Sequence, residues 1–259
     1  MNATALFLVT HGSSDRRSWL ALQNLVTVAR SRKNKYGDDY DNRYINGGCL
    51  EGQELNLSQQ LEQFATEVIL DGVSEIVILP LFLLEGVHVS EDIPEQVAIA
   101  ESKLTDKLAE KFTAQFPDRS IFRIMPHVGT DKEIPSLLLQ HFEKYSEKSE
   151  KSNSEPQGRI LIAHGSRRLG ANQVVEDLAM RSQAIAAYWG VEPKIETQVE
   201  NLLAQGISKI NVLPYFLTEG GITEAIANKL KPYRDHTQIQ QLPVPLSNEQ
   251  IVDLALKLI

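Results

Sequence analysis

Short apolar runs alternate with amphipathic stretches along the chain. Residues 4–10 are apolar, with β-branched side chains, and lead directly into His-Gly-Ser-Ser at residues 11–14, a pattern typical of a strand that meets a turn. Residues 55–70 instead place Leu, Phe, Ala and Val at helical spacing, which predicts an amphipathic helix. Strands that alternate with helices indicate a parallel sheet covered on both faces, with right-handed crossovers.

The same pattern occurs twice, in the same order. An apolar run ends in His-Gly-Ser in each half of the chain, and a longer Gly-to-Gly segment matches its counterpart in kind without a gap. The matched pairs are residues 6–13 with 159–166, residues 72–86 with 206–220, and residues 120–129 with 237–246. Three matched segments in one order predict a duplicated domain.

The chain of 259 residues is long enough for two domains. We predict an α/β fold with two tandem lobes, residues 1–145 and 159–259, each a small doubly wound unit. Residues 146–158 carry almost no apolar side chains and are rich in Ser, Lys and Glu, which indicates an exposed linker. The polar, glycine-containing stretch Lys33 to Gly48 is interpreted as irregular, and could form a loop over a site.

Composition excludes several functional classes. The net charge is −8, whereas general nucleic-acid binding requires a basic face. Cys49 is the single cysteine, so an intrachain disulfide and a cysteine-held cluster are excluded, and any metal chemistry must use His and carboxylate groups. No run approaches the ~20 apolar residues of a membrane span. Residues 1–4 lead into the first apolar run without a basic start and a cleavage site, so we expect no signal peptide. We therefore expect a cytoplasmic protein that binds neither membrane nor nucleic acid.

Three candidate functional residues follow predicted strands of the first half. His11 follows the first strand, Glu51 follows the short segment 48–50, and His88 lies in the loop after residues 79–82. Because ligands bind beyond the carboxyl ends of strands in an open parallel sheet, these side chains can converge. Imidazole and carboxylate groups are ligands for divalent cobalt, iron and nickel, and imidazole also accepts protons near neutral pH.

The second half provides an internal control. His164 keeps the position of His11, but Ile222 stands where His88 stands, and residues 183–193 contain no convincing counterpart of Glu51. Duplication followed by the loss of one site predicts this asymmetry, with the chemistry in the first lobe.

Other acidic and imidazole groups have simpler interpretations. Glu85 has a counterpart, Glu219, in the half that lacks the second histidine, which favours a backbone or loop role. We interpret the remaining histidines, His127, His141 and His236, as surface or core residues.

Residues 8–13, 49–51 and 79–88 resemble the type II tetrapyrrole chelatases of the CbiX and sirohydrochlorin chelatase family. The resemblance extends over nearly the whole chain in the two-domain form of that family. It implies two flavodoxin-like lobes, with the tetrapyrrole in the active cleft between them and no organic cofactor. It also implies that His11 and His88 handle the metal ion and accept protons, and that Glu51 is the acidic partner. The surroundings of Glu51 depart from the more apolar family pattern, so Glu54 is the alternative.

The implied reaction is the insertion of Co²⁺ or Fe²⁺, with Ni²⁺ as a further candidate, into sirohydrochlorin or a related anionic tetrapyrrole. Such a step belongs to cobalamin or sirohaem biosynthesis. Replacing two pyrrole protons by one ion requires a base near the ring and a ligand that holds the ion loosely, and histidine does both. The candidate contacts to the substrate are Ser13, Ser14, Arg16, Arg17 and His164. Because the two lobes are fused, we expect a monomer.

Two other functions remain open at this point. A non-catalytic carrier of tetrapyrrole or metal would use the same residues without turnover. A phosphoryl-transfer enzyme would carry phosphate on His11, beside Gly12 and two serines, but it gives His88 no necessary role, and the usual arginine clamp for phosphate is not evident.

Overall fold

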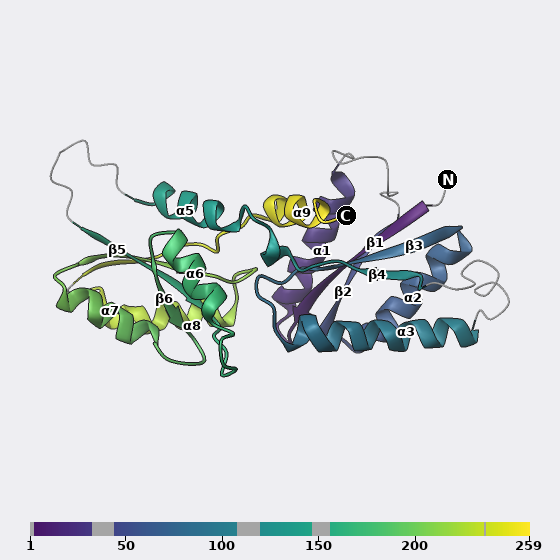
Figure 1. Ribbon diagram of the computed structural model, residues 1–259, viewed down its shortest axis with the longest axis horizontal. Coiled ribbons are helices and arrows are strands. Elements are labelled where there is room, and N and C mark those ends of the chain that lie inside the picture. The colour runs from purple at the N-terminus through teal and green to yellow at the C-terminus, as the bar shows by residue number, and fades with distance from the viewer. Residues whose placement is uncertain (1–2, 33–43, 108–119, 147–155, 236) are drawn as a thin grey trace. The chain divides into compact units, whose positions relative to one another are not determined.

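The computed structural model describes residues 3–32, 44–107, 120–146, 156–235 and 237–259. Within these residues the chain forms two four-stranded parallel sheets flanked by helices (Figure 1), with strand orders β2-β1-β3-β4 and β6-β5-β7-β8. The predicted α/β fold with two small parallel sheets is therefore confirmed. None of the described helices is both long enough and apolar enough to cross a lipid bilayer.

The strands of the first sheet are β1 (Ala3–Gly12), β2 (Ile45–Glu51), β3 (Val73–Pro80) and β4 (Phe122–Ile124), and those of the second are β5 (Gln157–Ala163), β6 (Ile185–Tyr188), β7 (Lys209–Pro214) and β8 (Gln238–Gln241). The longer helices are α1 (Arg16–Ser31), α2 (Leu57–Leu70), α3 (Ile93–Lys107), α5 (Ile134–Lys144), α6 (Gln173–Arg181), α7 (Ile195–Ala204), α8 (Gly221–Leu230) and α9 (Asn248–Leu256). Short helical turns within the described residues are η2 (His88–Asp92), η3 (Val128–Thr130) and η4 (Lys231–Tyr233).

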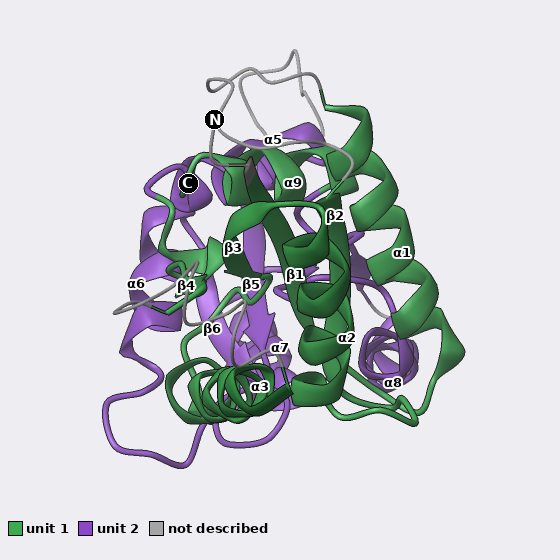
Figure 2. Cartoon of the chain, turned by 90° about the vertical axis from the view of Figure 1, so that its right-hand side faces the viewer, with its two compact units in different colours: residues 1–131, 247–259 green, residues 132–246 purple. Residues whose placement is uncertain are grey.

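The chain divides into two compact units (Figure 2), residues 1–131 with 247–259 and residues 132–246. Helix α9 follows β8 in the sequence but packs on α1 in unit 1, where Arg32 forms an ion pair of 3.0 Å with Asp253. Helix α5 follows β4 but packs on α6 in unit 2. The division expected at 1–145 and 159–259 follows the sequence repeat, and the compact units differ from it by the exchange of these two helices.

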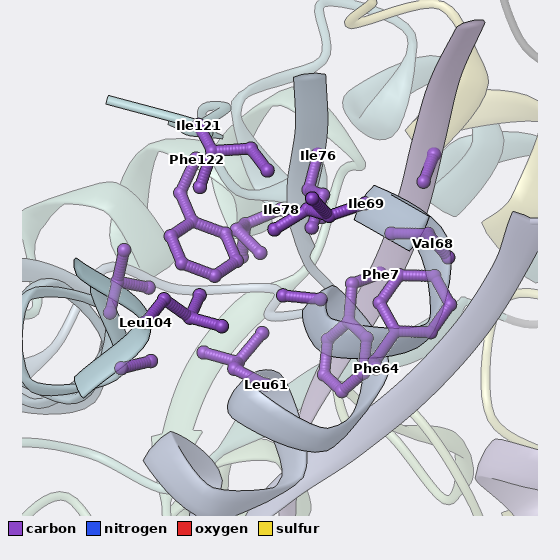
Figure 3. Close-up of a cluster of buried hydrophobic side chains, with 14 of the residues drawn as sticks. Phe7, Leu61, Phe64, Val68, Ile69, Ile76, Ile78, Leu104, Ile121 and Phe122 are labelled. Atoms are coloured by element: carbon purple, nitrogen blue, oxygen red, sulfur yellow. The ribbon is translucent and has the colours of Figure 1, made fainter. Parts of the chain in front are cut away.

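Strand β1 is buried on both faces, which explains its unbroken apolar sequence. Residues 5–10 are all buried, and Phe7 packs in a cluster with residues of α2 and α3, where its ring lies 5.3 Å from that of Phe64 (Figure 3). Burial of one such aromatic side chain contributes on the order of 2 kcal/mol. The packing holds β1 rigidly and so positions the residue at its end, His11.

The N-terminal part of β2 differs from the sequence interpretation. Residues 45–48 belong to a strand that starts at Ile45 and are not irregular. A Cβ on Gly47 would lie 2.9 Å from the Leu8 carbonyl oxygen, and one on Gly48 would lie 2.5 Å from Oε1 of Gln60. These glycines therefore allow close packing inside the sheet rather than a loop. The rest of the predicted loop, 33–43, lies outside the described residues.

Two other sequence boundaries shift slightly. Helix α2, predicted over 55–70, begins at Leu57 because the Asn56 side chain accepts a hydrogen bond from the Gln59 amide. The predicted linker ended at residue 158, but Gln157 already belongs to β5 and pairs with Lys209 of β7. Within the linker, residues 147–155 lie outside the described residues.

Candidate functional site

The carboxyl end of the first sheet gathers three predicted site residues. His11 is the penultimate residue of β1, Glu51 ends β2, and His88 begins η2 after β3. Gly12 pairs with Glu51 in the sheet register and has a φ of +80°. A Cβ at Gly12 would lie 2.1 Å from the Glu51 carbonyl oxygen, so only glycine fits there. The turn after His11 is therefore held directly against the end of β2.

The two predicted imidazoles lie side by side. Nε2 of His11 is 3.1 Å from Nε2 of His88. The ring centroids are 4.5 Å apart, and the ring planes meet at 84°. His11 is exposed and His88 is partly exposed, so an incoming ion or molecule can reach both rings. Residues that are 77 positions apart in the sequence thus form one site.

The other nitrogen of each ring faces an acceptor. Nδ1 of His11 lies 2.8 Å from the Gly12 carbonyl oxygen, and Nδ1 of His88 lies 2.6 Å from Oδ2 of Asp92. A carbonyl and a carboxylate oxygen accept hydrogen bonds, so each Nδ1 carries a hydrogen and donates it. The lone pairs of the two Nε2 atoms then face each other. A metal cation placed between the nitrogens would accept both lone pairs.

The spacing of the Nε2 atoms suits one metal ion. With metal–nitrogen distances of about 2.1 Å, nitrogens 3.1 Å apart give an N–metal–N angle of about 95°. Such an angle is compatible with octahedral or distorted tetrahedral coordination. Two imidazoles leave the remaining coordination positions open to water or to a substrate.

The predicted carboxylate is not assembled with the imidazole pair. Glu51 and Glu54 are both exposed, and across the described part of the chain no three His, Cys, Asp or Glu side chains are placed together to hold a metal ion. Burial raises the pKa of the Cys49 thiol, whose Sγ lies 3.2 Å from the Glu51 carbonyl oxygen, so Cys49 stays protonated and does not bind metal. The structure therefore brings together His11 and His88, and Glu51 lies at the neighbouring strand end.

The predicted substrate contacts of the first lobe fall into two groups. Ser13 accepts the Asp15 amide in the turn before α1, at 3.1 Å. Arg17 donates to the Asp15 carboxylate through its backbone and its side chain, which lowers the pKa of Asp15. These contacts cap α1 with a negative charge, so the start of this helix is not an open anion site. Ser14 and Arg16 are exposed beside them.

The model of the CbiX family matches residues 5–145 and 158–255, which is most of the chain. This chain belongs to the CbiX family. The finding agrees with the resemblance seen in the histidine motifs.

A sirohydrochlorin cobaltochelatase of Priestia megaterium is 24% identical over 212 residues, which cover 78% of this CbiX-family chain and 63% of the relative. The chain therefore spans less than two thirds of that relative's length. The structure of SirB from Bacillus subtilis with Fe³⁺ matches with a TM-score of 0.74 at 17% identity, over 99% of this chain and 94% of SirB. SirB from Bacillus subtilis subspecies spizizenii in complex with cobalt matches with a TM-score of 0.70 at 16% identity, over 99% and 93%. The two structural matches establish a common fold.

The second unit of this CbiX-family chain retains a counterpart of only one of the three candidate residues His11, Glu51 and His88. His164 is exposed at the end of β5, and its carbonyl oxygen accepts the Gly190 amide at 2.7 Å. Gly165 has the same φ of +80° as Gly12. Counting along the sheet from the pair Ala163 with Tyr188 places Gly190 where Glu51 stands in the first sheet. The sheet register thus identifies Gly190 as the counterpart of Glu51, which the sequence alone did not reveal. Glycine carries no carboxylate.

Asp92 contacts the imidazole pair and was not among the candidate residues that the sequence indicated. It lies four residues after His88 and bonds its Nδ1. The spacing itself was a signal, because residues four apart on a helix face each other. Because His88 was placed in a loop, this helical spacing was not used.

The histidine and glutamate residues left out of the predicted site lie in environments that suit structural roles. His127 is buried, and burial lowers its pKa despite the opposing effect of Glu85. Burial also lowers the pKa of His141, which is partly exposed. Glu219 accepts the Val244 amide at 2.9 Å, as expected for the loop role predicted for the Glu85 and Glu219 pair. His236 lies outside the described residues.

Proposed function

We propose that this CbiX-family protein is a sirohydrochlorin chelatase that inserts Co²⁺ or Fe²⁺ into the macrocycle. Membership of the chelatase family supports the reaction class. The observation that carries the proposal is the pair of Nε2 atoms of His11 and His88, 3.1 Å apart, with each Nδ1 atom next to an oxygen acceptor. The two Nε2 lone pairs can bind one metal ion and leave its other coordination positions open.

The two imidazoles match the stoichiometry of metallation. One divalent ion enters the ring and two protons leave its pyrrole nitrogens. While the ion is bound to the protein, it occupies the Nε2 lone pairs of His11 and His88. As the ion passes to the ring nitrogens, the same two lone pairs become free and each accepts one proton. The protons then pass to water, which reaches the exposed ring of His11.

The site residues indicate the class of reaction more closely than they indicate the metal ion. Imidazole accepts Co²⁺, Fe²⁺ and Ni²⁺, and cellular supply often decides which ion is used. The curated relative is named a cobaltochelatase, which favours cobalt and the cobalamin route. Fe²⁺ would lead to sirohaem. We propose no organic cofactor, because proton transfer and metal exchange need only the side chains described.

Local cations must attract the anionic tetrapyrrole, since the net charge of −8 opposes it at long range. We propose Arg16 and Ser14 as contacts to substrate carboxylates in the first unit. Arg17 and Ser13 shape the turn that presents them, and Arg17 remains a candidate contact. His164 is the proposed contact from the second unit. We expect the protein to act in the cytoplasm as a monomer, because one chain carries both repeats, and sedimentation analysis would test the monomer.

The decisive experiment is an anaerobic assay of sirohydrochlorin with Co²⁺, Fe²⁺ and Ni²⁺ in parallel. Substoichiometric protein should metallate many equivalents of substrate faster than the protein-free control, which the absorbance change of the macrocycle reports. Equal rates with and without protein would exclude the chelatase. One equivalent bound without turnover would indicate the carrier instead.

A further inference from the structure

Asp92 sits behind the catalytic pair. Its Oδ2 lies 2.6 Å from Nδ1 of His88, on the side of the ring opposite to His11. We propose that Asp92 is a positioning residue, which holds His88 in the tautomer and orientation that direct its Nε2 lone pair at the metal. The inference rests on the proposed function.

The backbone around Asp92 is firmly held. His88 and Asp92 are the two ends of the short turn η2, and the carbonyl oxygen of His88 accepts the amide of Ile93. Ile93 is fully buried in the core of unit 1, directly after Asp92. At the other end, the amides of Val89 and Ser90 donate to the Gly86 carbonyl oxygen, both at 3.0 Å. The carboxylate is therefore presented to His88 by a turn that the core anchors.

The Asp92 carboxylate determines which nitrogen of His88 is available to bind the metal ion. A neutral imidazole carries its hydrogen on either nitrogen, and only the form with hydrogen on Nδ1 leaves Nε2 free to bind metal. Asp92 accepts that hydrogen and thereby selects this form. It also limits rotation of the ring. A carboxylate behind a metal-binding histidine strengthens the ligand in the same way in other metal sites.

The second unit shows that the fold does not need this carboxylate. Residues 206–220 match residues 72–86 without a gap, and the same offset places Ile222 at the position of His88 and Ile226 at that of Asp92. Helix α8 forms with these isoleucines, and Ile226 is fully buried. The histidine and the aspartate are thus present together in one unit and absent together from the other.

A contribution to stability alone is a poor explanation of Asp92. The side chains of His88 and Asp92 are each 39% exposed, and ion pairs with that exposure contribute little to stability. Loss of the carboxylate should therefore leave the melting temperature nearly unchanged. The loss of the carboxylate should instead weaken the binding of the metal ion.

The test compares Asp92→Ala and Asp92→Asn with Glu95→Ala, which removes an exposed carboxylate from the first turn of α3. In the metal-free protein, ¹⁵N NMR of the His88 ring should show the hydrogen on Nδ1 in the wild type and a mixture of tautomers in Asp92→Ala. Titration with Co²⁺ should show binding weakened by about 10- to 100-fold in Asp92→Ala. Asp92→Asn should recover most of the affinity, because its amide oxygen still accepts the Nδ1 hydrogen. Glu95→Ala should match the wild type.

The outcomes separate this inference from the proposed function. Wild-type affinity and an unchanged tautomer in Asp92→Ala would overturn the positioning role, and so would equal weakening in Asp92→Asn and Asp92→Ala. If instead the wild type binds Co²⁺ no better than His11→Ala or His88→Ala, the proposed metal site fails. The NMR measurement would still decide whether Asp92 orients the ring.

Discussion

The two units share a framework and differ in the residues that it carries. In unit 1 the amide of Leu81, just after β3, donates to Val9 of β1 at 2.7 Å, and in unit 2 the amide of Tyr215 donates to Ile162 of β5 at the same distance. Strand order and the glycine turn after the histidine are also the same. The chemistry is not the same, because the second unit has Gly190, Ile222 and Ile226 at the positions of the candidate groups.

This comparison separates fold from function. A fold determines where strand ends and helix starts lie, but the side chains placed there decide what the protein does. The second unit folds without the second imidazole and its carboxylate partner. Those groups of the first unit are therefore not required by the architecture, which makes them candidates for catalysis.

The largest effect is expected from loss of either imidazole. His11→Ala and His88→Ala should each lower the rate of metallation by roughly 10²- to 10⁴-fold, because each removes a metal ligand and a proton acceptor. The anaerobic metallation assay measures this loss, with Glu95→Ala as a folded control. Undiminished metallation by His88→Ala would exclude His88 as a metal ligand or proton acceptor and would make the first unit, in this respect, no different from the second.

The next effect concerns the glycine turns. Gly12→Ala should destabilise the protein by roughly 2 kcal/mol, because its φ is +80° and the new Cβ would meet the backbone of Glu51 at 2.1 Å. Gly165→Ala has the same φ, but its Cβ would first meet side chains at 2.8 Å, so we expect a smaller loss. Urea unfolding measures both losses. A larger loss for Gly165→Ala would contradict the comparison.

A smaller effect is expected at the end of β2. If Glu51 is the acidic partner, Glu51→Gln should lower the turnover rate about tenfold, whereas Glu54→Gln should leave it close to the wild type. The kinetic assay with purified variants would distinguish the two. The reverse result would assign the role to Glu54. No effect from either substitution would mean that the first unit uses only its imidazole pair.

The smallest effect concerns His127, whose counterpart in the second unit is Val244. Since burial lowers the pKa of His127 below its ordinary value of 6.5, the unfolded chain binds this proton more readily than the folded protein. The contribution of His127 to stability is therefore lost as the pH falls below about 6.5. His127→Val should flatten the fall of unfolding free energy between about pH 6.5 and 5. Urea unfolding across that range would show it, and an unchanged slope would contradict the assignment.

Local patterns in the sequence determined most of the architecture. The apolar runs of β1 and β5 predict buried parallel strands because both faces of such strands are covered. The helical spacing before β3 predicts α2 to within two residues. Strand β2 was partly missed, because Gly47 and Gly48 resemble a loop while they serve close packing. Local periodicity cannot show what lies above a glycine in the folded sheet.

The sequence by itself determined the duplication and the two histidine motifs, since both are patterns within short segments. Only the tertiary structure decided that the Nε2 atoms of His11 and His88 lie 3.1 Å apart and that Asp92 lies against Nδ1 of His88. It also decided that Gly190 has the position of Glu51 and that α5 and α9 exchange units. Each of these depends on a turn, a strand register or a packing contact that only the folded chain defines. Short-range sequence patterns predict the helices and strands, whereas contacts between distant residues in the folded chain bring the site residues together.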